Sequence, residues 1–152
     1  MYEPADRSSI RWWRLPVAIP FVACVTVIDN MWKQAAVASG HSALDAPASI
    51  IRPALTLAVL VLALFGVLVL PRLCMVGALL VLSGVSSNIV SLGVWTAVPN
   101  PLGVHIGGGT LRFCLADTLV WSGSMLFLGA VLATLLRMPD DRFAELVGRS
   151  SA

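Results

Sequence analysis

Four long apolar segments constrain this chain of 152 residues more strongly than any other feature of its sequence. They lie at about 15–37, 54–70, 73–95 and 115–136. About 20 helical residues are enough to cross the ~30 Å hydrocarbon layer of a lipid bilayer, and the apolar segments are close to that length. The sequence therefore predicts an all-α integral membrane protein with a bundle of four transmembrane helices and the lipid bilayer as its partner.

The composition favours the same class of protein. Hydrophobic residues make up 58% of the chain and charged residues only 12%, whereas a soluble domain carries about 25% charged residues. The net charge of +2 is small and no basic patch with interleaved aromatic residues is present, so we expect no binding of nucleic acid. The three cysteines are spaced neither as metal ligands nor as a disulfide framework, so the sequence predicts no metal and no cofactor.

The basic residues indicate an orientation in the membrane. A polar arm at 1–14 precedes the transmembrane domain at 15–136, and a polar tail follows at 137–152. Cytoplasmic loops carry an excess of Lys and Arg, which predicts a multi-pass protein of the cell (cytoplasmic) membrane with both ends inside and with 38–53 and 96–113 outside. The expected inner side then holds Arg7, Arg11, Arg14, Arg72, Arg137, Arg142 and Arg149, and the outer side holds Lys33, Arg52 and Arg112.

Three ionisable residues within the apolar segments are the first candidates for a functional site, because charges inside a membrane are costly. Asp29 and Lys33 are four residues apart on one face of the first helix, the favourable order for an ion pair. The pair either neutralises itself, with Lys33 extending to the interface, or orients a site on the outer side. Asp117 is either a first-turn acid favoured by the helix dipole or a general base at the membrane surface.

A stripe of small polar residues marks one face of the third helix. Ser87 and Asn88 lie four and three residues before Ser91, so the three side chains share a face. Such residues either let helices pack closely and hydrogen-bond or contribute to a site. The stripe, Asp29 and Asp117 are all expected toward the outer ends of their helices, which is consistent with a shared site.

The order of these residues resembles signal peptidase II, the lipoprotein signal peptidase. The first-helix pattern of that family, Asp-Gln-x-x-Lys, is similar to Asp29-Asn30-Met31-Trp32-Lys33. Its third-helix pattern, Gly-Asn-x-x-Asp-Arg, is similar to Ser87-Asn88-Ile89-Val90-Ser91-Leu92. Its fourth helix opens with Phe-Asn-x-Ala-Asp and has a Gly six residues later, similar to Phe113-Cys114-Leu115-Ala116-Asp117 and Gly123. Four helices with both ends inside also match, so the resemblance covers most of the chain.

The resemblance implies an aspartic endopeptidase of the bacterial inner membrane, but one with a departure at its active site. Asp117 matches the second catalytic aspartate, whereas Ser91 stands at the position of the first, with Asn88, Asp29 and Lys33 as supporting residues. Two close carboxylates share one proton, which a serine hydroxyl cannot do at neutral pH. Because a general acid or base contributes about 10²–10⁴-fold, Ser91 predicts a very slow peptidase or an inactive one.

Further departures weaken the match. Leu92 replaces the Arg of the third-helix pattern and Cys114 the Asn of the fourth, and the Asn-x-Gly pattern expected after the first helix is not evident in 38–53. Asp29 is a conceivable replacement for the missing carboxylate, and Ser91 with Lys33 a conceivable nucleophile–base pair. The expected ion pair opposes both, because it holds Asp29 ionised and Lys33 protonated.

Three functions remain open from the sequence. The first is a signal-peptidase-II-like pseudoenzyme with lost or weakened catalysis that still binds the prolipoprotein signal segment. The second is an active lipoprotein signal peptidase with a variant dyad. The third is a structural or assembly subunit that binds another membrane protein, which the featureless second helix and the small residues Gly77 and Gly84 favour.

Overall fold

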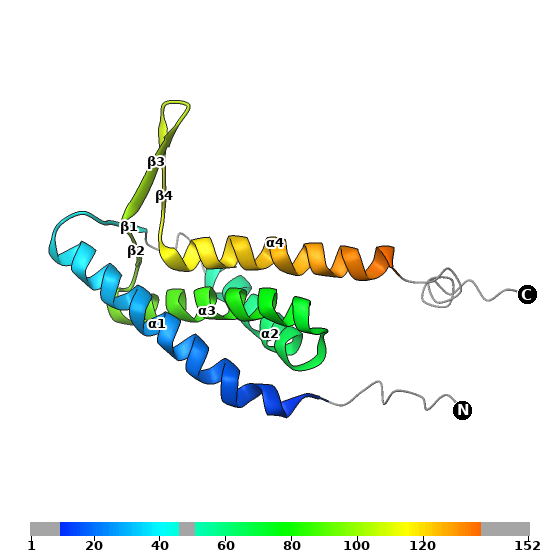
Figure 1. Cartoon of the computed structure of the whole chain (residues 1–152). Coiled ribbons are helices and arrows are strands. Elements are labelled where there is room, and N and C mark those ends of the chain that lie inside the picture. The colour runs from blue at the N-terminus through cyan, green and yellow to red at the C-terminus, as the bar shows by residue number, and fades with distance from the viewer. Residues whose placement is uncertain (1–9, 46–50, 138–152) are drawn as a thin grey trace, which may run out of the picture.

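The structure is a computed structural model that describes residues 10–45 and 51–137. Most of the expected cytoplasmic arm (1–14) and nearly all of the tail (137–152) therefore lie outside the described residues. Helix α3 is the centre of the arrangement and contacts each of the other three long helices (Figure 1). The elements in chain order are η1 (Trp12–Arg14), α1 (Leu15–Ala38), β1 (Ala43–Asp45), α2 (Ile51–Val69), α3 (Arg72–Trp95), β2 (Val98–Asn100), β3 (Leu102–Ile106), β4 (Gly109–Phe113) and α4 (Leu115–Leu136).

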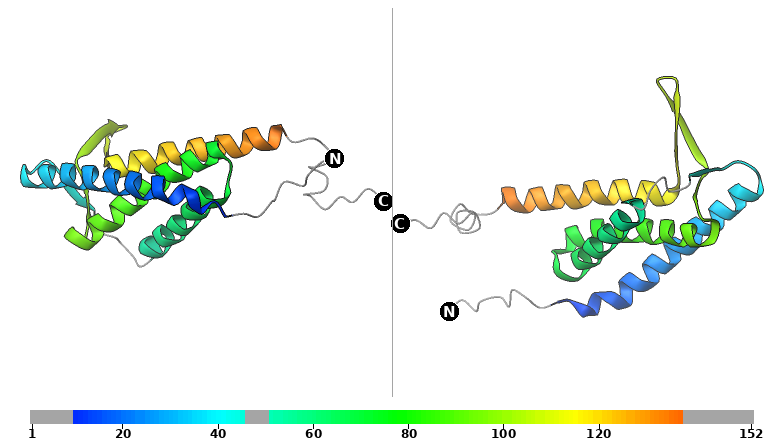
Figure 2. Two further views of the ribbon diagram at one scale, coloured as in Figure 1. Left: turned by 60° about the horizontal axis from the view of Figure 1, so that its bottom comes forward. Right: turned by 180° about the vertical axis from the view of Figure 1, so that it is seen from behind.

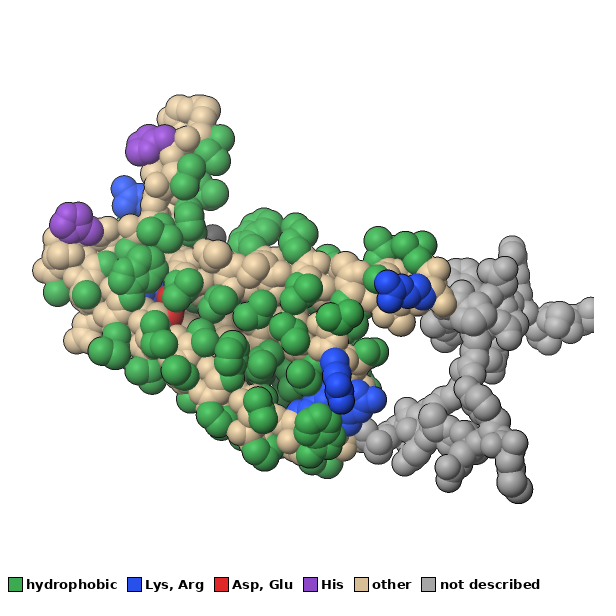
Figure 3. Space-filling model, viewed as in Figure 1, with side chains coloured by type: hydrophobic (Ala, Val, Ile, Leu, Met, Phe, Trp, Pro, Cys, Tyr) green, Lys and Arg blue, Asp and Glu red, His purple; other side chains and the backbone are tan. Residues whose placement is uncertain are grey.

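Three of the helical segments are long and apolar enough to cross a membrane: Trp12–Ala38, Arg72–Trp95 and Leu115–Leu136. The apolar part of α2 is shorter, at Leu55–Val69. Large hydrophobic side chains are exposed over the outward surfaces of these helices, among them Trp121 at 69% (Figure 3). A soluble protein rarely exposes so much contiguous apolar surface. The chain is therefore a membrane protein with its helices in a lipid bilayer.

The expectation of an all-α protein is wrong at one end of the bundle, where two small antiparallel sheets are present. Strand β1 pairs with β2, and β3 pairs with β4 in a hairpin. Gly107 and Gly108 both have positive φ and form the two-residue hairpin turn, which needs residues without a Cβ penalty. The expected loop at 96–113 is thus largely strand, because its apolar residues alternate on either side of a glycine turn.

Helices α3 and α4 cross so closely that their backbones touch. A Cβ atom on Gly77 would lie 2.7 Å from the backbone nitrogen of Phe127, and one on Gly123 would lie 2.7 Å from the carbonyl oxygen of Gly77. A Cβ atom on Gly84 would overlap the carbonyl oxygen of Ala116. Small residues allow this approach in membranes. The small-residue face that favoured an assembly subunit is therefore covered by α4 of the same chain.

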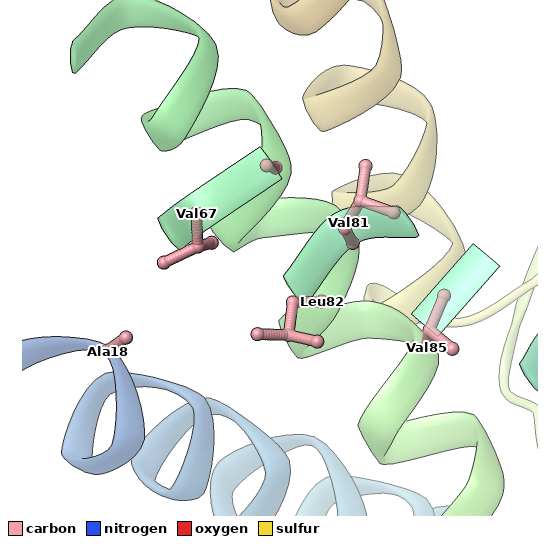
Figure 4. Close-up of a cluster of buried hydrophobic side chains, with 7 residues drawn as sticks. Ala18, Val67, Val81, Leu82 and Val85 are labelled. Atoms are coloured by element: carbon pink, nitrogen blue, oxygen red, sulfur yellow. The ribbon is translucent and has the colours of Figure 1, made fainter. Parts of the chain in front are cut away.

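The hydrophobic core lies between α1, α2 and α3. Ala18, Val67, Leu82 and Val85 point into it from three helices (Figure 4). Near this core the buried Arg14 donates from Nη1 to the carbonyl oxygens of Val67 and Leu70, both at 2.7 Å. These charge-assisted bonds satisfy carbonyls at the end of α2 that lack helical partners, and they fix the start of α1 against α2.

Candidate functional site

A hydrogen-bonded network of polar side chains lies at the end of the bundle nearest the two sheets. Helix α1 contributes Asp29 and Lys33, α3 contributes Asn88 and Ser91, and α4 contributes Asp117. All five are residues for which the sequence predicts a role, and the structure brings them together. Because polar groups are costly among apolar helices unless they are bonded, the network fixes how these three helices pack.

The ion pair of α1 is fully buried. The Nζ atom of Lys33 lies 2.7 Å from Oδ2 of Asp29, and both side chains are 0% exposed. The Ser87 hydroxyl donates to Oδ2 of Asp29 at 2.5 Å, and the backbone N–H of Ala116 donates to Oδ1 at 3.3 Å. Lys33 thus does not extend to the membrane surface, and Asp29 is bonded to α3 and α4 as well as to its own helix.

Lys33 uses all of its hydrogen-bonding capacity. Besides Asp29, its Nζ atom donates to Oδ1 of Asn88 and to Oγ of Ser91, each at 2.9 Å. An ammonium group has three N–H donors and no acceptor, so these three acceptors match its protonated form. The arrangement opposes a nucleophile–base pair of Ser91 and Lys33, because such a base needs a free lone pair on nitrogen.

Ser91 faces α1. Its side chain is 0% exposed, and its hydroxyl lies 3.1 Å from Oδ1 of Asn30 and 2.9 Å from the carbonyl oxygen of Ser87. Asn30 donates in turn to the Ser87 hydroxyl at 2.9 Å. Asn30 has no role predicted from the sequence, although it occupies the Gln position of the first-helix pattern, which was the available signal.

Asp117 is half-buried and its carboxylate accepts from three donors. Asn88 donates from Nδ2 to Oδ1 at 3.0 Å, while the backbone N–H and the thiol of Cys114 donate to Oδ2 at 3.0 and 3.3 Å. Burial, followed by the nearby Asp117 charge, raises the pKa of Cys114 to about 12, so its thiol keeps the proton that it donates. These contacts cap the start of α4 and hold the Asp117 carboxylate in place.

The two positions of the expected catalytic pair have different surroundings. Asn88 joins them, because its Oδ1 accepts from Lys33, which also binds Ser91, while its Nδ2 donates to Asp117. Ser91 is enclosed on the α1 side of α3. Asp117 instead lines an open cavity between α2, α3 and α4. Within the described residues, no group of three His, Cys, Asp or Glu side chains could hold a metal ion.

That cavity, of about 220 Å³, is the first part of a groove over α3 with α2 and α4 as its walls. A second, apolar cavity of about 230 Å³ continues it, and Val59 lines both. We call the two cavities together the groove. The first is lined by Leu55, Thr56, Val59, Val85, Asn88, Asp117, Val120 and Trp121, and the second by Val59, Leu62, Ala63, Ala78, Val81, Ser124, Phe127 and Leu128.

The groove gives a role to the second helix, which is featureless in sequence. One face of α2 forms a wall of the groove through residues such as Thr56 and Val59. Thr56 is a polar residue in an otherwise apolar segment, and it is the sequence signal that could have indicated this wall of the groove. Trp121 was not singled out either, because nothing in the sequence relates a tryptophan of α4 to a face of α2.

Comparisons with known proteins give a fold. The sequence matches no protein-family model, and no curated protein matches it. A solved structure described as a bacterial membrane enzyme, determined by the in meso method, is similar, with a TM-score of 0.68. The two share 14% sequence identity, and the match covers 87% of this chain and 96% of that chain. The fold is thus one that a bacterial membrane enzyme uses.

Proposed function

We propose that this chain is a signal-peptidase-II-like protein of the bacterial cytoplasmic membrane with lost or weakened endopeptidase activity, and that it binds the signal segment of prolipoproteins. In this proposal it crosses the membrane four times, with both ends in the cytoplasm. The observation that carries the proposal is the contrast between two positions. Asp117 opens onto the groove, whereas Ser91 is buried and bonded to Lys33.

The groove supports the binding half of the proposal. Its second cavity is lined almost entirely by apolar side chains, with Ser124 as its polar member. Its other end holds the polar pair of Asn88 and Asp117. An apolar helical segment followed by a polar peptide would suit these surfaces in that order, because apolar grooves accept the apolar face of a helix. A signal segment that enters a membrane and ends at a processing site has this pattern.

The polar network supports the loss or weakening of catalysis. Peptide hydrolysis by an aspartic peptidase needs one carboxylate to accept a proton from water and a second to donate one. Asp117 has a position suited to the first task, because it lines the groove. Asp29 is unsuited to the second, because Lys33, Ser87 and Ala116 already bond its oxygens.

An active peptidase with a variant dyad is the second candidate, and one contact favours it. Oδ1 of Asp29 accepts from the N–H of Ala116, the residue before Asp117. Asp29 is therefore the nearest alternative carboxylate to the start of α4 among the described residues of the network. For it to act as the acid, it would have to be protonated beside Lys33, which the 2.7 Å ion pair opposes.

The test measures binding and cleavage separately. Purified protein in lipid nanodiscs is mixed with a fluorescent diacylglyceryl-cysteine prolipoprotein peptide, and both saturation and product are followed. We expect saturable binding with cleavage absent or at least 100-fold slower than that of an active lipoprotein signal peptidase. Ser91→Asp, which adds the second carboxylate, is expected to increase cleavage, and adding Asp117→Asn to that variant should abolish the gain.

Ser122→Ala is a matched control, because Ser122 is exposed on α4 and bonds only carbonyls of its own helix among the contacts described. Fast cleavage by the native chain that Asp117→Asn abolishes would contradict the loss of activity and support the variant dyad. Absence of saturable binding would contradict the proposal that the chain binds the signal segment. A stoichiometric membrane protein retained in mild detergent, together with no peptide binding, would support an assembly subunit instead.

A further inference from the structure

The β3–β4 hairpin has one apolar and one polar face. In an antiparallel pair, residues that lie opposite each other point to the same side of the sheet. Val104 pairs with Leu111, whereas His105 pairs with Thr110 and Gly103 with Arg112. The apolar face is made of Leu102, Val104, Ile106, Leu111 and Phe113, and the polar face of His105, Thr110 and Arg112.

The apolar face is open. Ile106 is 64% exposed and Leu111 60%, and Val104 is 45% exposed. One face of a two-stranded sheet normally packs on a core, since an isolated hairpin is marginally stable in water. An exposed apolar face of this kind marks a surface that contacts another apolar phase or partner.

The position of the hairpin indicates what covers this face. The hairpin projects sideways from the start of α4, away from the other helices, in both views from the side (Figures 1 and 2). Strand β4 ends at Phe113 and α4 begins at Leu115, where the membrane-spanning segment Leu115–Leu136 also begins. The hairpin therefore leaves the bundle at the level where α4 enters the bilayer, and it extends along the plane of the membrane.

The two faces point in the directions that a bilayer requires. Hydrophobic side chains gather on the side of the hairpin toward the far end of α4, and histidine and basic side chains lie on the opposite side (Figure 3). Hydrophobic side chains also cover α4 on the side from which the hairpin projects (Figure 3). The apolar face thus continues the lipid-covered surface of α4 around a corner, while Arg112 and His105 face away from the hydrocarbon.

We propose that the β3–β4 hairpin is an interfacial membrane anchor that lies flat on the lipid surface, with Val104, Ile106 and Leu111 inserted at the boundary between headgroups and acyl chains. Arg112 and His105 face the headgroup phosphates and water. Because one residue, Cys114, separates β4 from α4, the anchor also fixes the depth of Asp117 relative to the lipid surface. A lipid surface is favoured over a protein partner because the face is continuous with surface that lipid already covers.

The test compares two adjacent residues that point to opposite faces. Spin labels are attached to Ile106→Cys and His105→Cys in a Cys24→Ser background, in which the remaining Cys74 and Cys114 are 1% and 0% exposed. The proteins are placed in dilute liposomes of phosphatidylcholine and phosphatidylglycerol. Relaxation by oxygen, which concentrates in the bilayer, is compared with relaxation by a water-soluble nickel chelate.

We expect the label at position 106 to be at least threefold more sensitive to oxygen than to the chelate, and the label at position 105 to show the reverse. High chelate sensitivity at both positions would overturn the proposal, since the hairpin would then stand in water. Protection of position 106 from both reagents would also overturn it, in favour of a second copy or another protein.

Quenching of tryptophan fluorescence by brominated lipid repeats the comparison without a spin label, with Val104→Trp on the apolar face and His105→Trp on the polar face. Equal quenching of the two variants would contradict the proposal. Neither measurement depends on peptide binding or cleavage, so failure of the anchor and failure of the proposed function can be told apart.

Discussion

Lys33 determines the chemistry that the network can perform. Its three donors match three acceptors on two helices, so the ammonium form is fully bonded although it is out of contact with lipid and water. The result is a buried ion pair whose two groups are also bonded to other helices, Lys33 to α3 and Asp29 to α3 and α4. These bonds hold the polar end of the bundle together.

Loss of the Lys33 charge should be strongly destabilising. Lys33→Met leaves the buried Asp29 without its counter-ion, and removal of one partner of a buried pair costs about 3–5 kcal/mol. Thermal unfolding in detergent, followed by tryptophan fluorescence, should show a large decrease in the midpoint. Lys33→Met combined with Asp29→Asn leaves no unpaired charge and should recover much of that loss. A single variant as stable as Ser122→Ala would mean that the pair is not buried as described.

At the scale of elements, the crossing of α3 and α4 connects packing to the candidate site. Gly84 contacts Ala116, and the N–H of Ala116 donates to Asp29. One tight crossing thus sets the distance from the network on α1 and α3 to the first turn of α4. Movement of α4 at this point would displace Asp117 from Asn88.

A single methyl group added at this crossing should therefore disturb the packing next to the candidate site. Gly84→Ala places a Cβ against the backbone of Ala116 and 2.8 Å from Cγ2 of Val120, and overpacking of this kind costs about 1–3 kcal/mol. We expect a lower unfolding midpoint and weaker peptide binding. Gly93→Ala on the same helix meets no atom within 4 Å and should be neutral or slightly stabilising. Equal effects of the two variants would contradict the close crossing.

The elements differ in how far the sequence predicts them. Apolar length and polar spacing indicate the helices and the residues of the network, because helical periodicity places Asp29 with Lys33 and Asn88 with Ser91. The hairpin is not predicted, because Gly and Pro in 96–113 indicate a loop, whereas Gly107 and Gly108 form a turn between alternating strands. The buried state of Lys33 was also beyond prediction, because it depends on acceptors from a different helix.

At the scale of the whole molecule, the groove is a feature that cannot be predicted from any single segment of the sequence. Its floor is α3 and its walls are α2 and α4, so its presence depends on two helices standing apart over a third. The likeness to the solved structure of a bacterial membrane enzyme covers 87% of this chain, so it extends over the bundle as a whole. A ligand that fills the groove would contact three helices at once.

Val59 offers the sharpest test of that view, because it lines both cavities of the groove. Val59→Trp adds a large side chain where the two cavities meet, and we expect it to weaken binding of the prolipoprotein peptide at least tenfold. Val61→Trp is the matched control, since Val61 lies on the same helix and is 58% exposed on the outer surface, where a tryptophan meets lipid. Fluorescence anisotropy of the labelled peptide in nanodiscs measures both affinities, and thermal unfolding confirms that the two variants fold. If Val61→Trp weakened binding as much as Val59→Trp, the peptide would bind on the outer surface of α2, and the groove would not be its site.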